Sequence, residues 1–224
     1  MTRIFKFHGQ SINDRFIKTA IENLNNGNVV LVPTDTGYAF VAHPRLESGV
    51  AKFFELRSTH SKQKPFSLLC ADTASVGRIS ILTTPTYRLA QRAWPGPYTF
   101  ILEPNKLAPK LASGPKRKSI GIRVPNHFII KALLHEINEP LLVTSVTDAE
   151  ELQNEMYYED QNEVDHWWTN AASIVGHFRN QNFICLEAES FIPLRTSTII
   201  DFTEEPAVII RDGEWDTDII GSLS

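Results

Sequence analysis

A short run of hydroxyl, carboxyl and phenol side chains follows an apolar segment near the N-terminus. Residues 29–32 are Val, Val, Leu and Val, an apolar and largely β-branched run typical of a buried strand. Pro33 has no amide N–H to donate, so we expect it to end the strand. The next five residues are Thr34, Asp35, Thr36, Gly37 and Tyr38. These residue types fit either a polar pocket at the strand end or an ordinary strand-to-turn junction.

Cationic side chains occur at two further places. The polar segment 57–64 contains Arg57, His60, Lys62 and Lys64. Four such donors suit a polyphosphate, and they equally suit an ordinary basic surface loop. Arg123 lies at the end of the apolar run GIRVP, two residues before Pro125. An arginine inside an apolar strand needs an anionic partner, which is either an internal carboxylate or a ligand.

Small hydroxyl side chains end or begin two more predicted strands. The run LLVTSVT supplies Thr144, Ser145 and Thr147. The run RTSTIID supplies Arg195, Ser197 and Thr198. Because open α/β sheets bind ligands at the ends of their strands, we expect Thr34, Arg123, Ser145 and Ser197 to surround one anionic ligand.

The elements that would position these side chains alternate along the chain. Patterns of apolar residues, caps and turn residues predict helices at 11–26, 46–57, 84–93 and 127–137, with Ser11 or Asn13 capping the first and Gly27 ending it. Strands are predicted at 28–32, 66–71, 98–102, 119–123, 141–144, 172–175, 198–202 and 207–211. Such alternation indicates an α/β fold with a twisted, mostly parallel or mixed sheet.

Length and charge limit the classes of protein. The chain has 224 residues, 42% of them hydrophobic, which suits one domain over residues 1–224. The net charge is −4, so the whole molecule is not an obvious nucleic-acid binder. Eight acidic residues lie within residues 148–165, a stretch without Lys or Arg. We expect a solvated acidic insertion at about 148–170, and an anion site elsewhere.

Several common motifs are absent from the sequence. It has no GxxxxGK[ST], GxGxxG, HExxH or GxSxG, and its seven histidines show no metal-ligand spacing, so no metal-binding residue is predicted. Only two cysteines occur, Cys70 and Cys185, far apart in the chain. Together with the lack of an apolar leader or an 18-residue apolar stretch, they predict a cytoplasmic protein.

Six segments, taken in order, resemble the YrdC/YciO family of threonylcarbamoyl-AMP synthases. PTDTGYAF is similar to the family signature PT[DE]TxYG[LF]. The others are KPFSLLC, WPGPYTFIL, IGIRVPNH, PLLVTSV and STIID, which resemble its KPL, WPGPxTxxL, VGxRxPxH, PLxxTSA and STIVD elements. The resemblance spans roughly residues 10 to 212. It implies a twisted, open, mixed sheet curved around one large basic groove.

The resemblance also implies an activity. Family members condense L-threonine, bicarbonate and ATP, with Mg²⁺ assisting, into threonylcarbamoyl-AMP and pyrophosphate, and the product serves to modify an adenosine of tRNA. No covalent nucleophile is required. By position, the resemblance assigns catalytic roles to Arg57 and Lys64, and substrate or ATP binding to Thr34, Thr36, Tyr38, Lys62, Arg123, Pro125, Ser145, Thr147, Arg195 and Ser197.

Two departures from the family pattern leave other functions open. Where the synthases have Lys-x-Arg, this chain reads LRST, with Arg57 the nearest candidate. Thr147 replaces the Asn of the SxN pattern, and a hydroxyl lacks the two donors of an amide. This drift is similar to the YciO branch. One alternative is therefore an RNA-binding protein for tRNA or double-stranded RNA, with the basic residues 116–118 and weak or no synthase activity. Another is an adenylating enzyme for a different small amine.

Overall fold

One mixed sheet organises the molecule. The computed structural model describes residues 2–56, 66–110, 118–146, 168, 170–190, 192 and 195–213. Within them, ten strands are ordered β1-β8-β2-β3-β7-β4-β6-β5-β9-β10. Their bounds are β1 (Arg3–Phe7), β2 (Val29–Thr34), β3 (Gly37–Ala42), β4 (Ser67–Leu69), β5 (Tyr98–Leu102), β6 (Ile120–Arg123), β7 (Leu141–Ser145), β8 (Ile184–Ala188), β9 (Thr198–Asp201) and β10 (Val208–Arg211). The predicted α/β class with a twisted, open, mixed sheet is confirmed.

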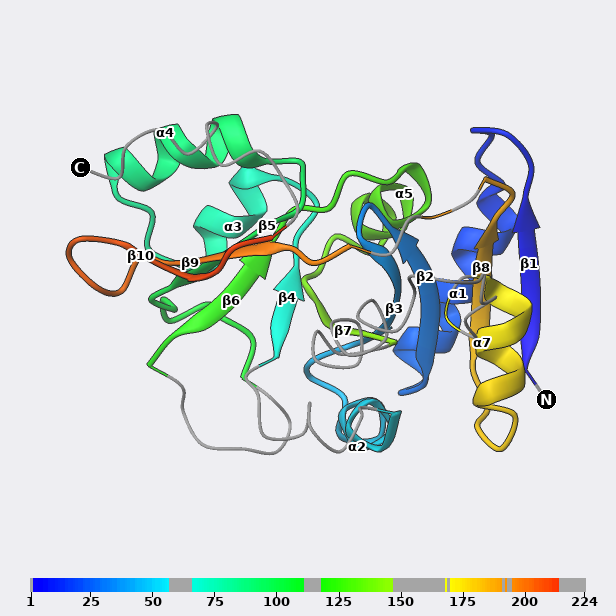
Figure 1. Cartoon of the computed structure of the whole chain (residues 1–224). Coiled ribbons are helices and arrows are strands. Elements are labelled where there is room, and N and C mark those ends of the chain that lie inside the picture. Colours follow the sequence, from blue (N-terminus) through cyan, green and yellow to red (C-terminus); the bar gives the residue numbers. More distant parts are fainter. Residues whose placement is uncertain are drawn as a thin grey trace.

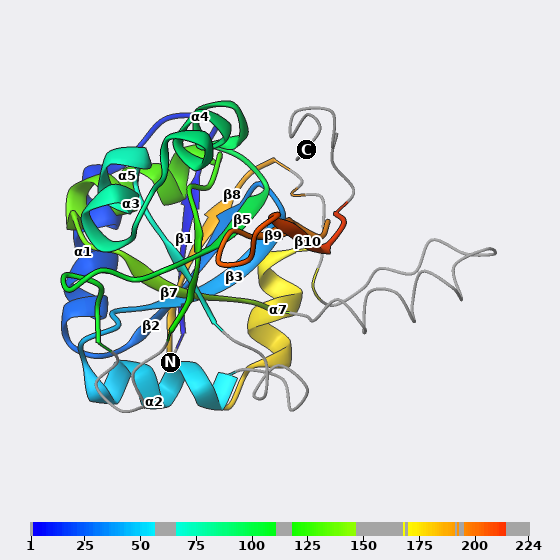
Figure 2. The same ribbon diagram turned by 90° about the vertical axis from the view of Figure 1, so that its left-hand side faces the viewer.

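Helices cover the two halves of this sheet separately. They are α1 (Asp14–Asn25), α2 (Glu47–Leu56), α3 (Thr73–Ile79), α4 (Thr84–Ala93), α5 (Phe128–Ile137) and α7 (Ala171–His177). In Figure 1, α3 and α4 lie with β5, β6, β9 and β10, whereas α1 and α7 lie with β1, β8 and β2. Figure 2 shows α1 and α7 on opposite faces of that second half. None of the helices that the structure describes has the length and apolar character needed to cross a membrane.

The ends of the helices follow the capping signals in the sequence. The side chain of Asn13 accepts hydrogen bonds from the amides of Arg15 and Phe16, so Asn13 caps α1 as predicted. The chain leaves this helix through Gly27, whose φ of 67° lies in the left-handed region. Helix α4 has the predicted bounds, with Pro85 in its first turn.

The prediction that Pro33 ends its strand is wrong. Strand β2 continues to Thr34 and forms a hairpin with β3, in which Pro33 is opposite Tyr38. On its other side β2 pairs with β8 only at Val30 and Leu31. Pro33 is therefore tolerated because no partner strand needs its missing N–H on that side. Strand β3 itself was not predicted.

A second prediction, a strand at residues 172–175, is also wrong. These residues lie in α7, and the side chain of Asn170 caps this helix by accepting a hydrogen bond from the amide of Ser173 at 2.8 Å. A short apolar run does not distinguish a strand from a buried helix, so its periodicity carried too little information. Strands β1 and β8 and helix α3 were likewise not predicted.

The core fixes the β2–β3 hairpin firmly. Every residue of both strands is buried. Phe40 of β3 packs edge-on against Phe178 and Phe183, with ring centroids 5.0 and 5.1 Å apart. Both cysteines are free and buried. The residues at the tip of this hairpin therefore rest on a rigid support.

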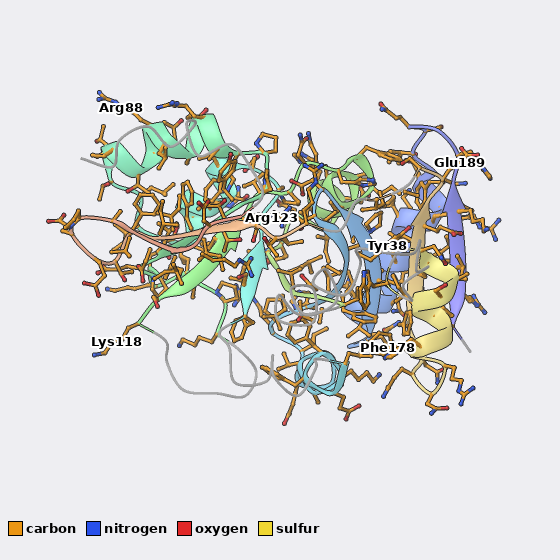
Figure 3. All side chains as sticks on the ribbon, viewed as in Figure 1. Tyr38, Arg88, Lys118, Arg123, Phe178 and Glu189 are labelled. Carbon is orange, nitrogen blue, oxygen red and sulfur yellow. The ribbon has the colours of Figure 1, made fainter. Side chains whose placement is uncertain are left out.

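Strand directions place Thr34 and Arg123 at opposite ends of the sheet, measured along its strands. Strand β2 is antiparallel to β3, β3 to β7, and β7 to β4, while β4 and β6 are parallel. Strand β6 consequently runs opposite to β2, so the C-terminal ends of the two strands point in opposite directions along the sheet. Arg123 nevertheless donates a hydrogen bond to Thr36, just beyond Thr34, at 2.7 Å. The sheet must therefore curve strongly to bring its two halves together, and Figure 3 shows Arg123 between them.

Candidate active site

The tip of the β2–β3 hairpin forms the first part of the site. The hydroxyl of Thr34 donates to the carbonyl of Gly37 at 2.7 Å and accepts from the amide of Thr36 at 3.1 Å. Gly37 has a φ of 116°, a conformation that a residue with a side chain rarely adopts. Thr34 thus closes the turn with its own hydroxyl, and the turn presents Asp35 and Thr36 to the rest of the molecule.

Arg123, at the end of β6, holds this turn from across the sheet. Its Nη1 donates to the Thr36 hydroxyl at 2.7 Å, its Nη2 forms an ion pair with Asp35, and its Nε donates to the Gly96 carbonyl at 3.2 Å. Only 9% of the Arg123 side chain is exposed. Of the two partners that the sequence allowed, the structure contains the internal carboxylate. These contacts use three of the five guanidinium N–H groups, and the other two have no acceptor among the described residues.

One carboxylate oxygen of Asp35 has no partner among the residues that the structure describes. Its Oδ1 faces Arg123, whereas its Oδ2 is buried and accepts no hydrogen bond from them. The side chain is 11% exposed. Buried polar atoms are nearly always paired with protein, water or ligand, so an orphaned carboxylate oxygen indicates a place for an N–H or O–H donor.

His127 adds a neutral donor near this carboxylate. It caps α5, and its Nδ1 accepts from the amide of Ile129 at 3.4 Å. Burial lowers the pKa of His127 to about 4, and the charge of Asp35 opposes this shift only in part. Near pH 7 the ring is therefore neutral, and because Nδ1 accepts, the proton resides on Nε2.

The segment before β9 reaches the same turn. The amide of Arg195 donates to the carbonyl of Thr36 at 3.3 Å. Ser197 is buried, and Arg211 of β10 donates from Nη2 to its hydroxyl at 2.8 Å and from Nε to its carbonyl at 2.9 Å. The prediction from sequence missed Arg211. The signal that could have found it is the one that identified Arg123, an arginine ending an apolar strand.

The other predicted residues occupy different environments. Tyr38 is buried in the hairpin, and its hydroxyl accepts from the amide of Ala188 at 3.3 Å, so the phenol faces β8. Pro125 is buried, whereas Ser145 is exposed at the end of β7, opposite Ala39. The described contacts join Thr34, Thr36 and Arg123, and bring Arg195 to the turn through its backbone. Arg57, Lys62, Lys64 and Thr147 lie outside the described residues, as do residues 116 and 117 and most of 148–170.

Among the residues that the structure describes, no three or more His, Cys, Asp or Glu side chains gather closely enough to hold a metal ion. A cavity of about 820 Å³ lies among α3, α4 and α5, lined in part by Trp94, Lys131 and His135. It includes none of the predicted site residues. The predicted basic groove stays a prediction.

Comparison with known proteins places these observations in one family. A family model for Sua5, YciO and YrdC sequences, described as "Telomere recombination", matches residues 22–213. The uncharacterised YciO protein of Escherichia coli K12 is 28% identical over 216 residues, which cover 96% of this chain and 98% of YciO. The crystal structure of E. coli YciO superposes with a TM-score of 0.81 at 27% identity, covering 98% of this chain and 99% of that one.

Two further relatives are known by an activity or a bound ligand. A threonylcarbamoyl-AMP synthase of Bacillus subtilis is 30% identical over 141 residues, covering 60% of this chain and 39% of the synthase. The crystal structure of P. abyssi Sua5 complexed with L-threonine superposes with a TM-score of 0.77 at 22% identity, covering all of this chain and 60% of Sua5. At that identity the second likeness shows the fold alone.

Proposed function

The chain belongs to the Sua5/YciO/YrdC family, and from this premise we propose that it makes threonylcarbamoyl-AMP from L-threonine, bicarbonate and ATP. The threonine amine combines with bicarbonate to give a carbamate and water. A carbamate oxygen then attacks the α-phosphorus of ATP, and the bond to the β-phosphate breaks, releasing pyrophosphate. The product is a labile mixed anhydride, suited to rapid transfer of its threonylcarbamoyl group to an adenosine of tRNA.

The observation that carries this proposal is the orphaned oxygen of Asp35 beside Arg123. An amino acid offers both a nitrogen donor and a carboxylate, and the two groups need partners of opposite charge a few ångströms apart. Within the described part of the chain, Asp35 Oδ2 is buried without a donor and can accept from the amine, while two N–H groups of Arg123 have no acceptor and can bind the carboxylate. The ion pair between them fixes their relative positions.

The remaining groups of the site fit the other reactants. His127 is neutral at pH 7 and can donate from Nε2 to an oxygen of bicarbonate or of the carbamate. ATP enters as its Mg²⁺ complex, so the ion belongs to the substrate, where it offsets charge on the departing pyrophosphate. The protein's own contribution is to hold the reactants together and to neutralise charge, because the reaction needs no covalent intermediate on the enzyme.

The test is pyrophosphate release from ATP by the full chain. We expect release that requires both L-threonine and bicarbonate, and that falls strongly in Asp35→Asn, with a raised KM for threonine. Arg88→Gln is the matched control, because Arg88 is exposed on α4 and lies far from Arg123 in Figure 3. Release that ignores threonine, or that another amino acid supports better, would refute the proposed substrate. Salt-sensitive tRNA binding without any ATP turnover would refute the synthase proposal altogether.

A further inference from the structure

The cavity among α3, α4 and α5 lies outside the candidate active site and is large enough for a small molecule. Its volume of about 820 Å³ is within the range of ligand pockets, and Figure 2 shows the three helices together. Pro95 and Val124 line it, and the intervening Gly96 donates to the Val124 carbonyl at 2.9 Å and accepts from Arg123 Nε at 3.2 Å. Arg123 itself does not line the cavity, so the two sites adjoin at this turn and are separate.

One wall of the cavity is apolar. Trp94 is 5% exposed, its ring lies 4.4 Å from that of Phe100 between centroids, and its Nε1 donates to the Tyr98 carbonyl at 2.6 Å. The only polar atom of the Trp94 side chain is therefore used, and it offers the cavity hydrocarbon alone. Tyr87 of α4 also lines the cavity and is 48% exposed, so a ligand with an apolar body would remove aromatic surface from water.

The wall formed by α3 is recessed at a glycine. Gly77 lies inside this helix and lines the cavity, and its φ is not in the left-handed region. A Cβ atom at Gly77 would meet only Cδ1 of Leu82, at 3.9 Å, which is an ordinary contact. Glycine is less favourable than alanine within a helix. Neither the backbone nor the packing requires this glycine, and its missing side chain leaves the cavity open.

The wall formed by α5 is cationic. Lys131 and His135 are one helical turn apart, and both line the cavity. Among the described residues, no carboxylate lies within ion-pair distance of Lys131. Asp72, the cap of α3, also lines the cavity; a hydrogen bond from the Ser75 amide lowers its pKa, and Arg78 and His135 lower it further. The charge of Asp72 is thus already stabilised, whereas that of Lys131 is not.

The surroundings of the cavity carry the same sign of charge. The stretch 73–135, which contains α3, α4 and most of α5, has ten Lys and Arg residues and one acidic residue, Glu103. The whole chain nevertheless has a net charge of −4. A local excess of positive charge attracts anions whatever the sign of the total charge. The cavity therefore combines an apolar wall with a cationic one.

We propose that this cavity is a second binding site, which takes a small organic anion with an aromatic or aliphatic body. The body packs against Trp94 and Tyr87. The carboxylate or phosphate of the ligand accepts hydrogen bonds from Lys131 and His135, since an imidazole can donate in either protonation state. The inference goes beyond the proposed function and does not depend on it.

Titration of 2-naphthoate, 2-naphthyl phosphate and the neutral 2-naphthalenemethanol into the full chain, followed by NMR of the ligand, tests the site. We expect at least one anion to bind with a Kd of about 1 mM or tighter, about fivefold more tightly than the alcohol. The tighter of the two anions identifies the ligand's anionic group. Lys131→Gln should remove most of this preference and leave the affinity for the alcohol unchanged. Arg88→Gln, on α4 outside the cavity lining, should preserve the preference.

Gly77→Leu fills the cavity with a side chain that also favours the helix. We expect it to weaken the binding of all three probes about tenfold or more, in a protein that unfolds at no lower temperature than the wild type. Gly176→Leu is the matched control, because Gly176 lies in α7 and a Cβ there meets nothing within 4 Å. It should bind the probes as the wild type does. Ala74→Leu, on the same wall of the cavity, replaces Gly77→Leu if that variant unfolds.

The outcomes decide the site independently of the synthase proposal. Equal affinity for the anions and the alcohol, or no binding at 10 mM probe on the order of ten times the expected Kd, would overturn the inference. Probe affinities equal in Gly77→Leu and Gly176→Leu would place the probes elsewhere and overturn it too, as would an anion preference that Lys131→Gln leaves intact. The titrations need neither ATP nor L-threonine, so a protein that releases no pyrophosphate would refute the synthase proposal and leave the cavity site standing.

Discussion

Replacing Asp35 by Asn removes the negative charge beside Arg123 while keeping the shape of the side chain. Arg123 is 9% exposed, so its guanidinium cannot turn to water for compensation. Removing one partner of a buried ion pair typically costs about 3–5 kcal/mol. The Asn carbonyl oxygen can still accept from Arg123 Nη2. We therefore expect Asp35→Asn to lower the free energy of unfolding by about 3 kcal/mol, the lower end of that range.

Urea unfolding measures this loss. With a slope of roughly 3 kcal/mol per M, the midpoint should fall by about 1 M at unchanged slope. Arg123→Met and the double variant complete a mutant cycle. Once Arg123 is gone, the charge of Asp35 is itself unpaired, so we expect the double variant to be more stable than the two single losses predict. A loss below about 1 kcal/mol in Asp35→Asn, or additive losses, would refute the reasoning.

Two further predictions concern His127 and Gly213. The pKa of His127 is lowered to about 4 from 6.5. As the pH falls between these two values, the unfolded chain binds a proton that the folded protein does not bind, so the free energy of unfolding declines. His127→Asn keeps a capping side chain and should flatten that decline by up to about 2 kcal/mol in urea unfolding, and an unchanged pH profile would contradict this. Gly213→Ala should lower the free energy of unfolding by about 1–3 kcal/mol, because its Cβ would press on the carbonyl oxygen of Thr196. Gly176→Ala, where a Cβ meets nothing within 4 Å, is the matched control and should be neutral or stabilising.

Local signals in the sequence predict several elements well because those signals act over short distances. Pro85 in the first turn and the WPGP turn that follows bracket α4, and its bounds and those of β5 agree with the prediction. Strand β3 was missed because GYAFVA follows a polar turn and has few β-branched residues. Its position is fixed instead by pairing with β2 and β7 and by the burial of Phe40, which are tertiary effects.

The site could be predicted only as a set of residue types. The apolar surroundings of Arg123 indicate that it needs an anion, but nothing local identifies Asp35, which is 88 residues away in sequence. The same reasoning applies to Arg211, which ends the run VIIR and was not selected. The pairing of β10 with β9 brings Arg211 to Ser197, and a sequence without known strand order does not reveal that contact.

The curvature of the sheet determines which of these residues meet. Four strand-to-strand steps separate β2 from β6, so in a flat sheet the two strands would lie roughly 19 Å apart, at about 4.8 Å a step. The 2.7 Å contact between Arg123 and Thr36 therefore exists only because the open sheet twists and curves strongly. That contact and the ion pair between Arg123 and Asp35 link the two halves of the sheet. A ligand that binds both Asp35 and Arg123 must strengthen this link. By linkage, weakening the link must lower the affinity for an amino acid that needs both residues.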